Sequence, residues 1–126
     1  MKRSAILTPL LSLSLLAAAL PAQAAGDPAA GEKLYVRCQG CHSIDTNRVG
    51  PRHQGLFGRA AGSLDDYNYS DAMRASDVVW DETTLDKFLT APREFIKGTK
   101  MPFNGMKDAQ ERADLIAYLK AATAVP

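Results

Sequence analysis

The chain of 126 residues is 46% hydrophobic and 23% charged, with nine glycines and seven prolines. This composition fits a globular domain and excludes a disordered chain, a collagen-like repeat and a coiled coil. Fifteen basic against 14 acidic residues give a formal charge of +1, too even for a dedicated nucleic-acid or anionic-membrane binder. Two cysteines and two histidines exclude a disulfide framework, a four-cysteine zinc site and an iron–sulfur cluster held by one chain.

Residues 1–24 have the pattern of a secretory signal peptide. Two basic residues precede an apolar stretch over 6–20, and Ala22 and Ala24 supply the small residues that precede a cleavage site. We predict cleavage after Ala24, which leaves one domain over 25–126 in the periplasm. Because cleavage removes two positive charges, the formal charge changes from +1 to −1. A retained membrane anchor is the alternative, although the stretch is shorter than the roughly 20 residues of a spanning helix.

The first half of this domain predicts one helix followed by a long loop. Asp27 and Pro28 have the pattern of an N-cap and a first helical residue, which predicts a helix to about Gln39. The segment 43–70 has no sustained periodicity. A loop of that length in a small domain usually wraps something.

The second half predicts three helices. A short one begins at Ser70 or Asp71, a second begins at Asp81 and stops before Pro92, and the last begins at Asp108 with a pattern that resembles a capping box. Apolar residues at helical spacing follow two of these starts: Leu85, Phe88 and Leu89, then Leu115, Ile116, Leu119 and Ala122. The prediction is an all-α fold with long loops. Since few large apolar residues are available to bury so much loop, a group other than protein should complete the core.

Cys38-Gln39-Gly40-Cys41-His42 is C-x-x-C-H, the attachment motif of c-type haem. Two thiols three positions apart can reach two vinyl groups of a porphyrin, and the next residue then directs an imidazole at the iron. A thioredoxin-like site would need a strand before a helix, a zinc site would need four ligands, and a disulfide here would close too short a loop to stabilise the fold. We predict one haem c, bound covalently through Cys38 and Cys41 with His42 as its proximal ligand.

The distal position has several candidates: Met73, Met101, Met106, His53, or no protein ligand. Met101 is favoured because it lies in the irregular segment 97–107, where it is free to approach a cofactor, and Pro102 stiffens the next step. Residue spacing alone leaves the alternatives open.

These motifs together resemble class I c-type cytochromes, the branch of mitochondrial cytochrome c and its bacterial relatives. The resemblance covers about 31–122. It rests on the stretches 31–35, 38–42, 49–51, 55–59, 67–72, 80–85, 98–101 and 112–120. It implies a cytochrome c fold, with crossing terminal helices and long loops around one haem.

The resemblance also implies roles for individual residues. His42 and Met101 would be the axial ligands, and the Pro51 carbonyl would accept the imidazole N–H. The residues implied around the haem are Arg59, Tyr69 and Trp80 at a buried propionate, Phe103 beside the exposed edge, and Gly31 with Tyr118 at the helix crossing.

Four positions depart from the family pattern. Phe88 stands where a tyrosine commonly reaches the methionine sulfur, and Met73 stands where an asparagine often joins the same polar network. His53 replaces an apolar residue near the haem, and Lys97 replaces a frequent proline. These departures change the surroundings of the predicted ligands.

With both axial positions filled, the predicted function is one-electron transfer rather than catalysis. The resemblance implies a monomeric carrier between a quinol–cytochrome c reductase and an oxidase, peroxidase or photosynthetic reaction centre. Four basic residues and one acidic lie over 93–107, against seven acidic and one basic over 65–86, which indicates a basic rim for docking. The expected rim is Lys33, Arg37, Lys97, Lys100 and Lys107. The alternatives are a haem peroxidase or gas-ligand sensor with a labile distal ligand, and an anchored haem subunit.

Overall fold

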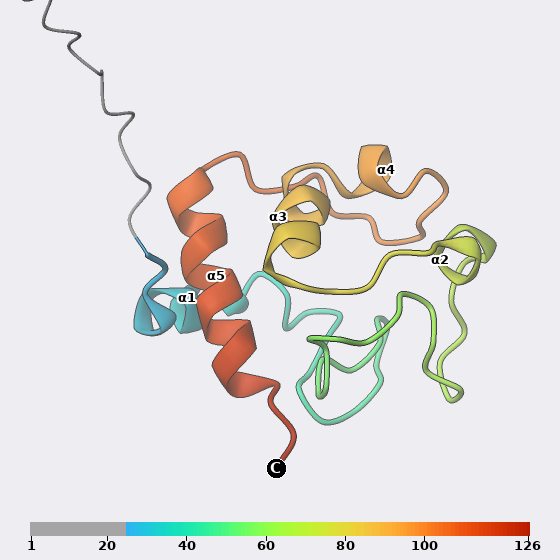
Figure 1. The fold of residues 1–126 in the computed structure, drawn as a ribbon, viewed down its shortest axis with the longest axis horizontal. Helices are drawn as coiled ribbons and strands as arrows, with labels where there is room; N and C mark the ends of the chain where they lie inside the picture. The colour runs from blue at the N-terminus through green and yellow to red at the C-terminus, as the bar shows by residue number, and fades with distance from the viewer. Residues whose placement is uncertain (1–24) are drawn as a thin grey trace, which may run out of the picture.

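The computed structural model describes residues 25–126, so the predicted signal peptide lies outside the described residues. The helices are α1 (Pro28–Tyr35), α2 (Asp71–Ala75), α3 (Glu82–Thr90), α4 (Pro92–Phe95) and α5 (Ala109–Ala122). Between α1 and α3 the chain runs mostly as loops, joined at one point by an isolated antiparallel bridge of Ala60 and Val79 (Figure 1). The predicted all-α fold with long loops is confirmed. No helix over 25–126 is long and apolar enough to cross a membrane.

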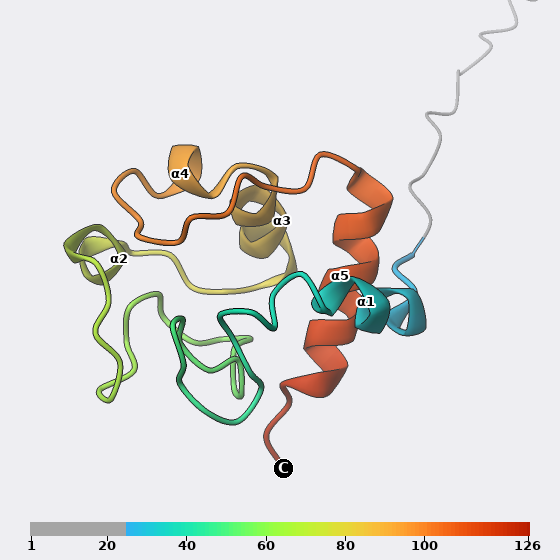
Figure 2. The ribbon, with the colours of Figure 1, turned by 180° about the vertical axis from the view of Figure 1, so that it is seen from behind.

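The terminal helices α1 and α5 cross in contact with each other, as both views show (Figures 1 and 2). Gly31 lies at the crossing, where a Cβ would fall 2.0 Å from the Asp114 carbonyl oxygen and 2.7 Å from the Cβ of Tyr118. The Asp27 N–H donates to the Asp114 carboxylate at 2.8 Å. A glycine is therefore needed for the two backbones to approach this closely, at the helix crossing that the resemblance implies.

Side-chain caps start the longer helices. Asp81 begins α3 with a reciprocal capping box, because its carboxylate accepts the Thr84 N–H while the Thr84 hydroxyl accepts the Asp81 N–H. At α5, Asp108 accepts the Glu111 N–H at 2.8 Å, which is half of the box that the sequence predicts. The Glu111 carboxylate binds Arg37 at 2.9 Å, so it links α5 to the turns that follow α1.

One helix boundary and one additional short helix differ from the prediction. Helix α1 ends at Tyr35 rather than near Gln39, and the chain continues to 41 in turns. The Cys38 N–H, for example, donates to the carbonyl three residues earlier at 2.8 Å. The four-residue α4 was not predicted, because Pro92 reads as a stop. Pro92 does end α3, but it is also the first residue of α4, because a proline at the first helical position loses no hydrogen bond.

The core lies between α1, α3, α5 and the loops that face them. Its buried side chains include Tyr35, Leu56, Trp80, Leu85, Phe88, Leu89, Ile96, Met106, Leu115, Ile116 and Leu119. Arg112 of α5 is buried among them and pairs with Asp86 of α3 at 2.7 Å. The same guanidinium donates to the carbonyl oxygens of Met106 and Lys107, at 2.9 and 3.0 Å, which fixes the segment before α5.

Candidate functional site

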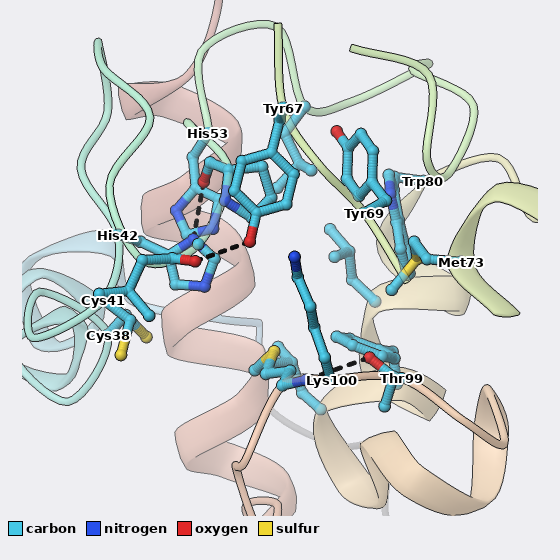
Figure 3. Close-up of a pocket in the computed structure, with 18 of the residues that line it drawn as sticks. Cys38, Cys41, His42, His53, Tyr67, Tyr69, Met73, Trp80, Thr99 and Lys100 are labelled. Atoms are coloured by element: carbon cyan, nitrogen blue, oxygen red, sulfur yellow. Dashed lines mark hydrogen bonds between the residues drawn. The ribbon is translucent and has the colours of Figure 1, made fainter. Parts of the chain in front are cut away.

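A cavity of about 370 Å³ lies inside the loops (Figure 3). This volume is within the range of roughly 300–1,000 Å³ for small-molecule and cofactor sites. The predicted site residues that line it are Cys38, Cys41, His42, Pro51, Arg59, Tyr69, Trp80 and Met101. Leucines and Phe88 from α3 and α5 make the wall apolar. Phe103 is outside the lining and packs, partly buried, against the core.

The two cysteines lie where the turns after α1 meet the cavity. Cys38 and Cys41 form no disulfide, and their sulfur atoms point in the same direction in Figure 3. Backbone bonds from the N–H groups of Cys41 and His42 to the Cys38 carbonyl, at 3.1 and 2.9 Å, set the spacing of the motif. Burial raises the pKa of the Cys38 thiol to about 11, so this thiol is protonated near neutral pH.

His42 is buried, and its ring is held at one edge and one face. Its Nδ1–H donates to the Pro51 carbonyl at 2.7 Å, which leaves Nε2 as the atom with a lone pair. Burial lowers the pKa of His42, so the ring is neutral at pH 7, as a metal ligand must be. A Cβ at Gly50 would lie 2.3 Å from the ring Cε1, so only a glycine leaves room for this ring position.

Arg59 places a positive charge at the cavity, and one of its three nitrogens makes no hydrogen bond in the part of the chain that the structure describes. Its two terminal nitrogens donate to the carbonyls of Gln54 and Arg52, each at 3.0 Å. Its Nε is buried and has no hydrogen-bond partner within residues 25–126. A buried unpaired donor on a cation is costly, and a carboxylate beside it would satisfy both the bond and the charge. Tyr69 and Trp80 line the same cavity and are buried.

The candidates for the distal ligand lie in three different places. Met101 and Met73 both line the cavity. Met106 lies in the core away from the lining, and its N–H donates to the Leu89 carbonyl. His53 stacks on His42, with ring centroids 4.3 Å apart and planes 19° apart. Because His53 lies beside the proximal candidate, Met101 and Met73 are the better placed distal candidates.

His53 has a second partner on the terminal helices. Its Nδ1 and the Tyr35 hydroxyl are 2.9 Å apart and form a hydrogen bond. Burial is the main cause that lowers the pKa of His53 to about 3, with smaller contributions from the neighbouring His42 and Arg59 side chains, so the ring is neutral near pH 7. Burial also raises the pKa of Tyr35 to about 12, which keeps its hydroxyl protonated.

Val49, Tyr67 and Lys100 also line the cavity, although the sequence did not assign them to it. The Tyr67 hydroxyl donates to the Val49 carbonyl at 2.6 Å. Lys100 reaches across with its Nζ 4.8 Å from the Tyr67 ring centre and donates to the Asn68 carbonyl. Figure 3 shows the Lys100 side chain extending toward Tyr67. No sequence signal could have found this contact, because it joins two loops without periodicity.

The donor set fits a haem with thioether attachment. Two cysteines, a neutral histidine with Nε2 available, two methionines and an arginine with an unused donor surround an apolar cavity. These groups match covalent attachment, axial ligation and binding of one propionate.

Known proteins match this chain over most of its length. The family model described as Cytochrome c matches residues 28–123. Cytochrome c2 of Rhodomicrobium vannielii is 48% identical over 101 residues, which cover 78% of this chain and 81% of that protein. Cytochrome c of Sesamum indicum is 48% identical over 103 residues, 79% of this chain and 93% of that protein. The solved structure of cytochrome cH from Methylobacterium extorquens aligns with a TM-score of 0.74 and 43% identity, covering 76% of this chain and 99% of that one.

The matched region contains all helices of the described part of the chain, the C-x-x-C-H motif and the cavity. The matches confirm the resemblance that the motifs indicate, and with it a covalently attached haem c and a role in electron transfer rather than catalysis. The chain therefore belongs to the cytochrome c family.

Proposed function

We propose that the protein is a soluble, periplasmic one-electron carrier whose haem c has His42 and Met101 as axial ligands. The observation that carries the proposal is one cavity lined by both side chains, with the two cysteines beside it and the His42 Nδ1–H already bound to Pro51. Haem c, when bound, supplies the one-electron redox chemistry.

The chain's own residues would hold that group and set its surroundings. Pro51 fixes the tautomer of His42 and so leaves the lone pair of Nε2 available to a metal. Arg59, Tyr69 and Trp80 supply a cation and polar groups for a buried propionate. The apolar wall around Phe88 excludes water, and a dry surrounding disfavours the more highly charged oxidised centre.

The cavity gives little support to the peroxidase or sensor alternative. Phe88 carries no hydroxyl, and its ring packs against Trp80 with centroids 5.0 Å apart. His53 is stacked beside His42 rather than placed across the cavity as an acid–base group would be. The carrier is therefore the function that this geometry supports best. The anchored subunit is tested by N-terminal sequencing: an N-terminus at Ala25 supports a cleaved carrier, and an intact leader supports an anchor.

Electron partners would dock through the basic residues near the haem edge, and the contacts divide these residues into two groups. Three of the five already have partners within the chain: Arg37 with Glu111, Lys100 with Asn68, and Lys107 with the Thr90 carbonyl. All five are exposed, but the side chains of Lys33 and Lys97 have no hydrogen bond or ion pair within residues 25–126. We expect these two to contribute most to steering a reductase or a terminal acceptor.

The test is the rate of reduction by a quinol–cytochrome c reductase over a range of salt concentrations. The rate should fall with salt, and Lys33→Gln or Lys97→Gln should lower kcat/KM roughly 1.4- to 5-fold at low salt, because an exposed ion pair contributes about 0.2–1 kcal/mol. Lys87→Gln is the matched control, since Lys87 lines a separate groove between α3 and α5. A rate independent of salt, or equal effects of all three substitutions, would refute this docking surface.

A further inference from the structure

The ring of His42 is held by contacts that the haem motif does not explain. The C-x-x-C-H spacing places His42 at the cavity, and the Pro51 carbonyl fixes which nitrogen carries the proton. Neither the motif spacing nor the Pro51 hydrogen bond fixes the angle of the ring about its Cβ–Cγ bond, because a single hydrogen bond tolerates a range of ring angles. The flat contact with His53 does restrict that angle, since the rings are 4.3 Å apart and only 19° from parallel.

His53 is itself held in place by the last residue of α1. Its Nδ1 is bound to the Tyr35 hydroxyl at 2.9 Å, and the two rings meet edge to face, with centroids 5.7 Å apart. Tyr35 is a residue of α1 with only 2% of its surface exposed, and its ring packs 5.3 Å from the ring of Tyr118 on α5. The contacts therefore run without a gap from the crossing of the terminal helices to the ring of His42.

This chain of contacts has the form of a ligand-orienting network. Side chains that touch a metal ligand commonly set its ring orientation and basicity, and so tune the metal. The two elements that His53 joins, α1 and the loop before Leu56, are also joined to each other through the core. An aliphatic side chain at position 53 would fill the space, but it would supply neither a flat ring to stack on His42 nor a hydrogen-bond acceptor for the Tyr35 hydroxyl.

We propose that His53 is a positioning residue that sets the ring angle of His42, and that Tyr35 holds His53 in place, so that the crossing of α1 and α5 controls the orientation of the axial ligand. This inference rests on the proposed function, because it assigns His42 as the proximal ligand of haem c. The angle of an axial imidazole decides how unpaired spin spreads over the porphyrin of a ferric haem, and it contributes to the reduction potential.

The experiment compares single-group changes in the haem-loaded protein. Tyr35→Phe removes the hydroxyl alone, His53→Phe keeps a ring but removes the acceptor, and His53→Leu removes both. Tyr118→Phe is the matched control, because it deletes the same atom from the neighbouring ring without touching the bond to His53. The readouts are the paramagnetic proton NMR shifts of the haem methyl groups in the ferric state and the reduction potential, with the unfolding free energy measured alongside.

We expect Tyr35→Phe and His53→Phe to change the spread of the methyl shifts and the potential in the same direction. The double variant with Tyr35→Phe and His53→Phe should differ little from either single variant, because both substitutions remove the same hydrogen bond. His53→Leu should give the largest change, and Tyr118→Phe should match the wild type. If the shifts and the potential of Tyr35→Phe and His53→Leu equal those of Tyr118→Phe, His53 only fills space and the inference is overturned, whatever happens to stability. Failure of the proposed function is distinct, because wild-type protein would then lack the methyl resonance of a ligated methionine. If His53→Leu does not fold, Tyr35→Phe alone decides between the outcomes.

Discussion

The substitution Gly50→Ala measures how firmly the protein holds the ring of His42. A Cβ at this position would lie 2.3 Å from the ring Cε1, and 2.6 and 2.7 Å from Nε2 and Nδ1. Optimal contact between such atoms is about 3.5–4.0 Å, so the ring or the backbone must move by more than 1 Å. Gly50 does not have a positive φ, so the added methyl group is the whole perturbation.

The ring cannot move without losing other contacts. The Pro51 carbonyl holds its Nδ1 at 2.7 Å, and His53 stacks against it. Overpacking of this kind costs about 1–3 kcal/mol, so Gly50→Ala should lower the unfolding free energy of the haem-loaded protein by that amount. Guanidinium unfolding followed by circular dichroism measures it.

Gly40→Ala is the matched control, because a Cβ at Gly40 would meet nothing within 4 Å. Its unfolding free energy should stay within about 0.5 kcal/mol of the wild type, as for other open surface positions. Equal stability of Gly50→Ala and Gly40→Ala would refute the tight packing of His42, and so would an unchanged His42 ring environment in the NMR spectrum of Gly50→Ala.

Three further substitutions test other parts of the fold and site. Gly31→Ala should lower the unfolding free energy by about 1–3 kcal/mol, because its Cβ would meet the α5 backbone, and this cost exceeds the gain in helix propensity from alanine. A variant as stable as the wild type, or more stable, would contradict the tight crossing. Asp114→Asn should remove a stabilisation that depends on pH. Hydrogen bonds from the Asp27 N–H and the Gln110 side chain hold the pKa of Asp114 below its ordinary 3.8. The carboxylate therefore stabilises the fold above pH 3.8, and this stabilisation is lost as the pH falls through the pKa of the folded protein. Unfolding measured from pH 7 to acid should show a shallower loss in the variant, and parallel curves would contradict this. Arg59→Leu should make the reduction potential vary with pH near neutrality, because a buried propionate without its cation would have a raised pKa; potentiometric titration checks this, and a flat profile would count against Arg59 as the partner.

Local signals made most of the helices predictable. Asp27, Ser70, Asp81 and Asp108 all cap helices, because an N-cap needs only a side chain that reaches the backbone two or three residues ahead. The C-x-x-C-H motif is equally local, since its chemistry depends on spacing within five residues. The early end of α1 was missed because tight turns and a helix share the same residue preferences over so short a stretch.

The contacts between loops were not predictable in this way. Lys100 meets Tyr67 and Asn68 across more than 30 positions, and His53 meets Tyr35 across 18. Nothing in the residue pattern fixes how a loop without periodicity returns to another one. The unused Nε of Arg59 likewise appears only once the backbone carbonyls that take its other two nitrogens are in place.

The assignment of the axial ligands is tested most directly by the optical spectrum of the oxidised, haem-loaded protein at neutral pH. The weak red charge-transfer band of methionine sulfur on ferric iron should be present in the wild type and absent from Met101→Ala. It should persist in Met73→Leu, the control for the other methionine that lines the cavity. A wild-type spectrum without the band, or a band that survives Met101→Ala and disappears in Met73→Leu, would contradict the account.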